Sequence, residues 1–134
     1  MIYGENRLAN GFVGGDISAL PHSVTRHDPS LVTQVLARHH GNIVNIAHTF
    51  FQPHEFRADH VNADVDELLI AVQGVIDVTS GDDTVTLDAG LGGYVFIPHG
   101  VTQAEKNNGN EQAALLSIAI RNELFVHLNQ IITE

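Results

Sequence analysis

The stretch PHEFRADHVNADVDELLIAVQG, residues 53–74, decides how the chain is interpreted. It places His60, Asn62 and Glu67 within eight residues and then runs into LLIAV, the apolar pattern of a strand. A second stretch, residues 92–107 (GGYVFIPHGVTQAEKN), looks like its partner. We expect the two stretches to face each other inside a small β-structure and to line one pocket.

Short strand patterns separated by turn residues fill the chain from residue 31 to residue 120. LVTQVLARHH and IVNIAHTFF flank Gly41-Asn42, which predicts a hairpin. The first of these segments could also start a helix capped near Ser30, but its Val and Thr content favours a strand. LLIAV, VIDVT, TVTL, YVFIP, VTQAEKN and EQAALLSIAI follow, with turn signals roughly every ten residues. This meander of short strands predicts an all-β sandwich or closed barrel.

The two ends of the chain differ from this middle part. Residues 1–30 are rich in Gly, Asn and Ser and predict an irregular arm, with one short strand around Gly11–Val13. Such an arm either packs on the barrel or reaches across a dimer. Residues 121–134 carry apolar residues at a helical spacing and predict a short C-terminal helix. We expect one domain over residues 1–134.

Charge and cysteine content limit the classes of function. Sixteen acidic residues against six basic ones give a formal charge of −10, which makes nucleic acid and membrane surfaces poor partners. The absence of cysteine excludes disulfides, thiolate catalysis and cysteine-ligated zinc. The first residues lack the features of a signal peptide, and no apolar run approaches the ~20 residues that span a bilayer. We expect a cytoplasmic protein.

Two spaced sets of residues resemble the two sequence motifs of the cupins, with every spacing kept. The first set is His54, His60, Asn62, Glu67 and Gly74. The second set is Gly92, Pro98, Gly100, Gln103 and Asn107. The resemblance implies a single-domain cupin, which is a jelly-roll β-barrel with a small-molecule pocket, and it implies a homodimer.

The same motifs depart from the family at the metal ligands. In cupins, two histidines and a glutamate of the first motif and a histidine of the second usually hold a divalent metal. Here His60 and Glu67 remain, whereas Asn62 and Gln103 replace histidines. Amide oxygens are weak neutral donors, so this set predicts a poor iron or zinc site. A spare histidine could complete it, and His48 on the preceding strand is the best candidate. The expected cofactor is therefore none, or one divalent ion held by His60, Glu67, Gln103 and His48.

Strand alternation extends the predicted pocket beyond the motifs. If Gln103 points inward, Glu105 should do so too, because side chains on one face of a strand repeat every two residues. Leu69 and Ala71 should likewise follow Glu67 inward and form apolar walls. Two nearby carboxylates in such surroundings favour each other's neutral form, as in general acids and bases. The other interpretation places Glu105 beyond the rim of the barrel, in water.

Three functions fit these residues. The first is a small-molecule enzyme of isomerase, epimerase, cyclase or lyase type. Its catalytic residues would be His60, Glu67 and Glu105, and its substrate-binding residues Asn62, Gln103, Leu69 and Ala71. The second is a metal-dependent cupin, such as a dioxygenase, with an altered ligand set. The third is a non-catalytic cupin that binds a small molecule.

Overall fold

The structure is a computed structural model that describes residues 1–4, 6–7, 9–25 and 31–121. The predicted C-terminal helix over residues 121–134 lies outside the described residues, apart from Arg121, which ends the last strand. Within the described ranges, no helix is long and apolar enough to cross a membrane.

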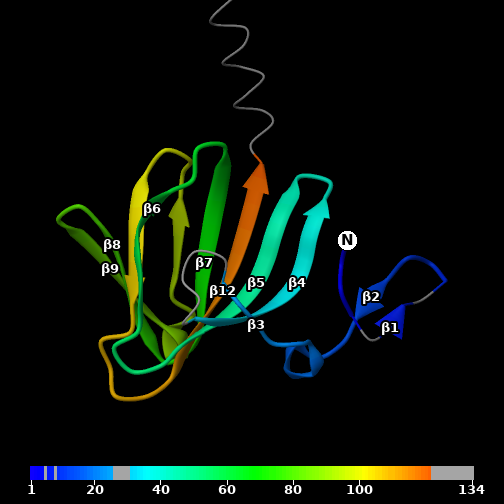
Figure 1. Cartoon of the computed structure of the whole chain (residues 1–134), viewed down its shortest axis with the longest axis horizontal. Helices are drawn as coiled ribbons and strands as arrows, with labels where there is room; N and C mark the ends of the chain where they lie inside the picture. The colour runs from blue at the N-terminus through cyan, green and yellow to red at the C-terminus, as the bar shows by residue number, and fades with distance from the viewer. Residues whose placement is uncertain (5, 8, 26–30, 122–134) are drawn as a thin grey trace, which may run out of the picture.

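Strands make up most of the described chain (Figure 1). The first strands are β1 (Asn6–Arg7), β2 (Val13–Gly14), β3 (Ser23–Val24), β4 (Val32–His40), β5 (Ile43–Phe51) and β6 (Phe56–Val61). The remaining strands are β7 (Val65–Gln73), β8 (Val75–Ser80), β9 (Asp83–Asp88), β10 (Tyr94–Ile97), β11 (Thr102–Lys106) and β12 (Ala113–Arg121). Two short 3-10 helices, η1 (Ile17–Ala19) and η2 (Ala89–Leu91), complete the elements. The all-β prediction is therefore confirmed in its coarse form.

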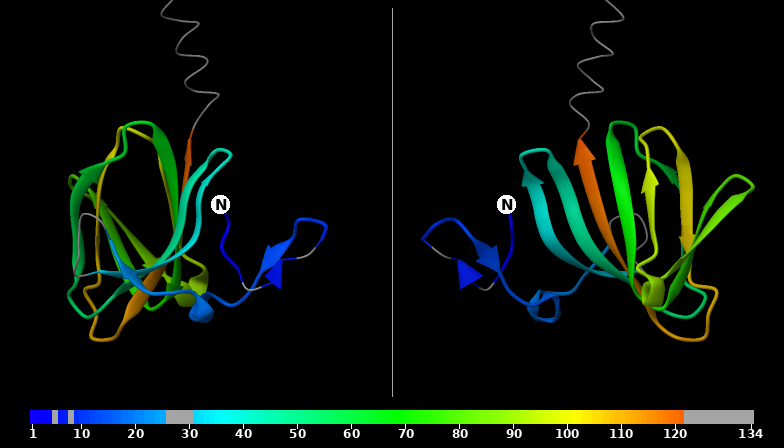
Figure 2. Two further views of the ribbon diagram at one scale, coloured as in Figure 1. Left: turned by 45° about the vertical axis from the view of Figure 1, so that its right-hand side comes forward. Right: turned by 180° about the vertical axis from the view of Figure 1, so that it is seen from behind.

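Two antiparallel sheets face each other (Figure 2). The larger has the strand order β10-β7-β12-β5-β4-β3, and the smaller has the order β6-β11-β8-β9. Within the described residues no strand pair joins one sheet to the other, so the sheets form a sandwich and the predicted closed barrel is corrected. The physical reason is that closure needs hydrogen bonds between the edge strands of the two sheets.

The predicted hairpin and the predicted meander have different outcomes. β4 and β5 pair antiparallel across Gly41, whose φ is 58°, so the choice of strand over helix is confirmed. β7 and β8 follow each other in sequence but lie in different sheets. Gly74, with a φ of 66°, stands between them. A simple meander is therefore wrong at this point, because the chain crosses from one sheet to the other.

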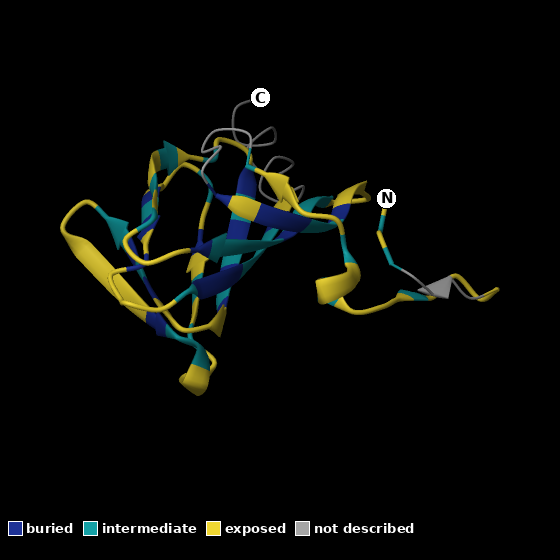
Figure 3. Cartoon of the chain, turned by 60° about the horizontal axis from the view of Figure 1, so that its bottom comes forward, coloured by how far each residue is buried: buried dark blue, intermediate teal, exposed yellow. Residues whose placement is uncertain are grey.

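The hydrophobic core lies between the two sheets (Figure 3). Alternate residues of β7 point into it, and Leu69 and Ala71 are 1% and 3% exposed. They pack with Ile76 and Leu87 of the smaller sheet. The alternation that buries these apolar side chains also turns Glu67 inward, since it occupies the same face of β7.

The N-terminal arm extends beyond β4, away from the sandwich (Figure 1). β1 and β2 pair as a small separate sheet, and β2 lies at the end of the predicted strand around Gly11–Val13. The arm is tied to the large sheet through Gln34 on β4, whose Nε2 donates to the carbonyls of Ile17 and Leu20 at 2.9 and 3.0 Å. Gln34 is 1% exposed, so this anchor is buried.

Candidate functional site

Four polar side chains from three strands meet between the sheets. His60 lies on β6, Glu67 on β7, and Gln103 and Glu105 on β11. Gln103 and Glu105 are buried while their neighbours on β11 are less so, as alternation along a strand requires. We call His60, Glu67, Gln103 and Glu105 the interior cluster.

The amide of Gln103 joins the imidazole and one carboxylate. Its Nε2 lies 2.8 Å from His60 Nε2 and donates to Glu67 Oε1 at 2.8 Å. His60 Nδ1 lies 2.9 Å from the carbonyl of Ala58, which can only accept. Nδ1 therefore carries the proton, and Nε2 is left as an acceptor directed at the cluster. The side-chain amide of Gln103 therefore contacts a neutral imidazole and a carboxylate at the same time.

Glu105 completes the cluster from the same strand as Gln103. Its side chain is 2% exposed, which decides between the two interpretations of this residue in favour of the interior. Its Oε1 lies 4.0 Å from His60 Nε2. Potential ligand atoms of His60, Glu67 and Glu105 all lie within 4.8 Å of one another.

A β-bulge brings an additional charge to the same interior. Gln103 is opposite His60, but Glu105 is opposite Arg57, so Ala104 alone faces two residues of β6. His60 and Arg57 are both partly buried, while the two residues between them are exposed. The bulge thus turns both side chains inward, although regular alternation would place residues three apart on opposite faces. Sequence reasoning missed Arg57 because nothing in the sequence marks this bulge.

A small cavity of about 20 Å³ lies beside Glu105. It is lined by Thr25, Thr49, Phe51, Arg57, Leu69, Glu105, Leu115 and Ser117. Such a space holds about one water molecule. Arg57 and Glu105 thus both border this small space. Opposite charges attract each other more strongly in such surroundings than in water.

The predicted substrate-binding residues fall into two groups. Leu69 and Ala71 are buried and inward-facing, as alternation predicts, and Leu69 lines the cavity beside Glu105. Asn62 is only half-buried, and its backbone carbonyl accepts from the amide of Gly100 at 2.7 Å. Within the described residues, no hydrogen bond joins its side chain to the interior cluster. Glu105 rather than Asn62 thus completes the cluster.

His48 does not belong to the cluster, and its prediction as a spare ligand is corrected. Its neighbour Thr49 lines the interior cavity, so His48 points to the opposite face of the sheet. There His48 Nδ1 lies 3.1 Å from Gln34 Oε1, and its ring meets Phe50 edge-on with centroids 4.7 Å apart. Burial lowers the pKa of His48, and the nearby His22 lowers it further.

The remaining polar motif residues hold turns. His54 has a φ of 66° and donates its backbone amide to the carbonyl of Asn107. The side chain of Asn107 donates to the carbonyls of Phe51 and Glu111, and its Oδ1 accepts from the amide of Gly109. Asn107 therefore has a structural role at this turn.

The donor set of the interior cluster suits a hard divalent cation. It offers one imidazole and two carboxylates, a ligand set that suits manganese better than zinc or copper, and the amide oxygen of Gln103 would add a fourth ligand if the amide turned over. Gln103 Oε1 is buried and accepts no hydrogen bond from the described part of the chain. A buried acceptor without a donor is a position that a cation would stabilise. The residues present therefore fit such an ion.

Comparisons with known proteins identify the fold. No protein-family model matches the sequence, and no curated protein matches it. Solved structures match well. The cupin domain of Cnp3 from Schizosaccharomyces pombe aligns with a TM-score of 0.73 at 16% identity, over 88% of this chain and 80% of that one.

Two further structural neighbours are named for an activity. A predicted oxalate decarboxylase from Thermotoga maritima aligns with a TM-score of 0.72 at 16% identity, over 80% of this chain and 97% of that one. A sugar phosphate isomerase of the cupin superfamily from Silicibacter pomeroyi aligns with a TM-score of 0.66 at 12% identity, over 80% of this chain and 74% of that one. At these identities the likeness shows the fold. The chain has the cupin fold, which carries both enzymes and other domains.

Proposed function

We propose that this cupin-fold chain is an enzyme that transfers protons on a small organic substrate, with His60 and Glu67 as the reacting pair. One observation carries the proposal: the Gln103 amide lies 2.8 Å from both His60 Nε2 and Glu67 Oε1. A base and a second proton-accepting group are thus held toward one point before any substrate arrives. Such positioning is a large part of general acid–base catalysis.

The protonation pattern supports distinct roles for the two groups. His60 Nε2 faces the cluster as an acceptor, because Nδ1 is held by the carbonyl of Ala58. Glu67 is 7% exposed and lies where little water reaches. His60, which is 21% exposed at its side chain, is the member of the cluster nearer to solvent. A substrate entering from outside would meet the imidazole first.

Glu105 has a supporting role in this proposal. It lines the small cavity together with Arg57, and its side chain is 2% exposed. A fixed negative charge 4.0 Å from His60 Nε2 would stabilise the imidazolium that forms when the ring takes up a proton. Glu105 would thus act through its charge, and Gln103 would hydrogen-bond a carbonyl or hydroxyl of the substrate.

The reaction class follows from what such a pair can do without a second substrate. A proton leaves a carbon next to a carbonyl, is held on His60 or Glu67, and returns to the same or a neighbouring carbon. Isomerisation and epimerisation balance in this way, and lyase or cyclase steps use the same first transfer. The likeness of fold to a sugar phosphate isomerase is in keeping with this class.

Solvent deuterium exchange tests the proposal without a known substrate. The full chain is incubated in deuterated water with a panel of aldoses, ketoses, their phosphates and 2-keto acids, and loss of carbon-bound protons is followed by proton NMR. We expect exchange in one compound class, lost in Glu67→Gln and His60→Asn but kept in Asp82→Asn, a matched carboxyl-to-amide change in the exposed turn after β8. Equal exchange in Glu67→Gln and the unmodified chain would contradict the proposal.

A second candidate is supported by the ligand geometry of the cluster. His60, Glu67 and Glu105 present ligand atoms within 4.8 Å, and Gln103 Oε1 would join them if the amide turned over. A divalent ion held there would polarise a substrate carbonyl. Arg57 works against this candidate, because a cation beside Glu105 repels another cation. For this reason the proton-transfer proposal is preferred.

Metal binding is measured separately from exchange. Calorimetric titration of the purified full chain with Mn²⁺ should show one site if the second candidate holds, weakened in His60→Asn and strengthened in Arg57→Gln, with Asp82→Asn as the control. Mn²⁺ binding that neither His60→Asn nor Arg57→Gln changes would mean that the ion binds outside the interior cluster. If neither exchange nor a specific ion is found in the folded protein, the non-catalytic binding alternative is favoured.

A further inference from the structure

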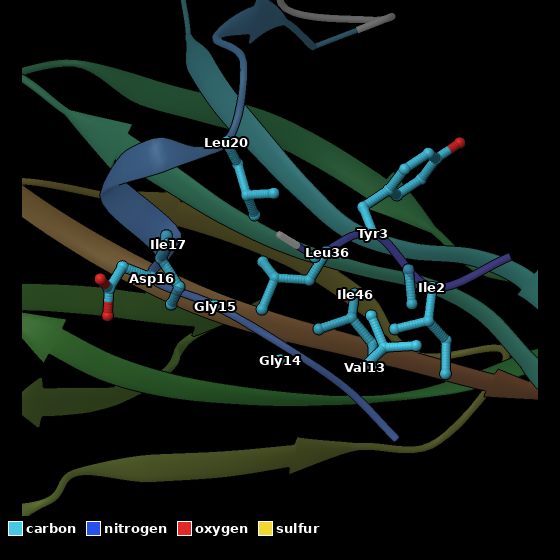
Figure 4. Close-up of a pocket in the computed structure, with 12 residues that line it drawn as sticks. Ile2, Tyr3, Val13, Gly14, Gly15, Asp16, Ile17, Leu20, Leu36 and Ile46 are labelled. Carbon is cyan, nitrogen blue, oxygen red and sulfur yellow. The ribbon is translucent and has the colours of Figure 1, made fainter. Parts of the chain in front are cut away.

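We propose that the cleft between the N-terminal arm and the large sheet binds a small apolar molecule that is uncharged or carries one positive charge. The cleft has a volume of about 270 Å³ (Figure 4). It lies on the outer side of the sheet, by which we mean the side that points away from the core. The interior cluster lies on the other side, so this inference is independent of the proposed reaction.

Two attachments to β4 hold the arm next to this part of the sheet. At the start of the chain, the amide of Tyr3 donates to the carbonyl of Leu36 at 2.7 Å. Further along, the buried side chain of Gln34 donates to the carbonyls of Ile17 and Leu20. The walls of the cleft are therefore fixed relative to each other within one chain, before any ligand arrives.

A β-bulge in β4 adds a side chain to the floor of the cleft. Val35 is opposite Ala47 and Ala37 is opposite Ile46, so Leu36 is the extra residue between them. Leu36 and Ala37 both line the cleft, although regular alternation would place neighbours in sequence on opposite faces. Bulges often direct a side chain toward a functional site in this way.

The wall on the side of the arm depends on a close approach between two of its segments. A Cβ at Gly4 would lie 2.7 Å from Cγ1 of Val13 and 2.9 Å from the carbonyl oxygen of Gly14. Only glycine allows the backbone to come so near. Ile2, Val13 and Ile17 supply apolar side chains to this wall. A mostly apolar cleft with few polar groups is typical of a small-molecule site.

The volume of the cleft limits the size of its occupant. An apolar cavity of ~150 Å³ binds benzene, so this cleft has room for a molecule of roughly two fused rings. A peptide helix does not fit, because one helical turn about 10 Å across fills roughly 400 Å³. The occupant is therefore a small molecule.

Charge limits the chemical class of the occupant. Asp16 is the one charged residue among the described residues that line the cleft. Figure 4 shows its carboxylate at one end of the cleft. The chain as a whole has a formal charge of −10. Both charges repel an anion, which disfavours fatty acids and phosphate esters and favours an uncharged or cationic apolar compound.

Two fluorescent probes that differ by one charge test the proposal. N-phenyl-1-naphthylamine is uncharged, and 8-anilino-1-naphthalenesulfonate is the same ring system with a sulfonate. The fluorescence of a fixed amount of the uncharged probe should rise and saturate as purified full chain is added, with a dissociation constant of about 100 µM or lower. The sulfonate should bind severalfold more weakly, and Asp16→Asn should reduce this difference. No saturable binding of the uncharged probe, or equal or tighter binding of the sulfonate, would overturn the proposal.

Two isoleucines provide matched variants. Ile46 on β5 and Ile118 on β12 are opposite each other, and both are half-buried on the outer side of the sheet. Of the two, Ile46 lines the cleft. Ile46→Asn should raise the dissociation constant of the uncharged probe about tenfold, because it puts a polar group into the floor of the cleft. Ile118→Asn should leave it unchanged. Equal dissociation constants in the two variants would contradict the proposed site.

NMR of the unmodified chain locates the probe without any substitution. Adding N-phenyl-1-naphthylamine to isotopically labelled protein should shift the amide signals of residues 2–4, 13–17 and 36–37 most strongly. Shifts centred on β6 and β11 would mean that the probe enters between the sheets. Shifts centred on β7 and β10 would mean that it lies on the uncovered part of the outer side. Either result would overturn the proposal.

Discussion

The side-chain amide of Gln103 donates to the carboxylate of Glu67 across 2.8 Å, with both residues more than nine-tenths buried. This hydrogen bond spans the two sheets, because Gln103 lies on β11 and Glu67 on β7. A carboxylate in the interior of a protein needs such a donor, since water cannot serve it there. The amide therefore has a structural role as well as its place beside His60.

Replacing Gln103 should lower stability by removing that donor. Gln103→Leu has a similar volume but leaves Glu67 Oε1 without its hydrogen bond, so we expect a loss of roughly 1–3 kcal/mol in the free energy of unfolding, measured in urea. Gln112→Leu is the control, since its hydrogen bonds to Gln52 and Gln73 lie on the surface. Equal losses in the two variants would show that the buried hydrogen bond contributes no more to stability than the exposed ones.

Asn107 should be one of the most sensitive polar positions in the chain. It is 1% exposed and makes three hydrogen bonds to backbone groups, at Phe51, Gly109 and Glu111. Asn107→Ala should cost about 2–3 kcal/mol, because these groups lose their partner in the interior. Asn108→Ala removes an exposed hydrogen bond to Asp77 and should cost under about 1 kcal/mol. A thermal melt of both variants compares them directly.

Gly74 should tolerate a side chain less well than Gly81. Both have positive φ, 66° and 58°, so alanine is strained at either position by roughly 1–2 kcal/mol. At Gly74 a Cβ would also lie 3.0 Å from the Cβ of Ala113 and 3.1 Å from the carbonyl oxygen of Gln112, whereas nothing lies within 4 Å at Gly81. Gly74→Ala should therefore lose more stability than Gly81→Ala in chemical denaturation. A larger loss in Gly81→Ala than in Gly74→Ala would argue against close packing around Gly74, where the chain passes from one sheet to the other.

Stability should fall below neutral pH through His48. Its pKa in the folded chain is lowered from the ordinary value of 6.5 by burial and by His22. The unfolded chain therefore takes up a proton first as pH falls through 6.5, which favours unfolding until the folded pKa is passed. His48→Gln keeps a side chain that can hydrogen-bond to Gln34 but that does not titrate. The free energy of unfolding of this variant should therefore drop less between pH 7 and pH 5 than that of the unmodified chain. If the free energy of unfolding falls with pH in parallel for the variant and the unmodified chain, the pH dependence does not originate in His48.

Local rules predicted the parts of the site that depend on one strand. Period-two alternation placed Leu69 and Ala71 inward, because a strand repeats its faces regardless of its neighbours, and it gave an inward Glu105 as one of two interpretations. The same rule did not say whether His48 or Thr49 faces the interior, since the choice depends on how the sheet packs. Closure of the sheets could not be predicted either, because it depends on bonds between strands far apart in sequence.

Arg57 shows a different limit of sequence reasoning. Its position three residues before His60 places it on the opposite face by alternation, and the bulge opposite Ala104 reverses that placement. A bulge depends on two strands together, and the sequence of either strand alone does not reveal it. The charge beside Glu105 is therefore a property of the paired strands.

The bulge also means that the length of β11 controls the charge of the interior. Inserting one residue beside Ala104 would restore regular pairing and leave Arg57 and Glu105 each three residues from the inward-facing residue of its own strand. Alternation would then turn both of these side chains to the opposite face, while His60 and Gln103 stayed in place. In relatives with this fold, one extra residue at this point of the strand would thus mark interiors that lack the guanidinium and the second carboxylate beside the imidazole.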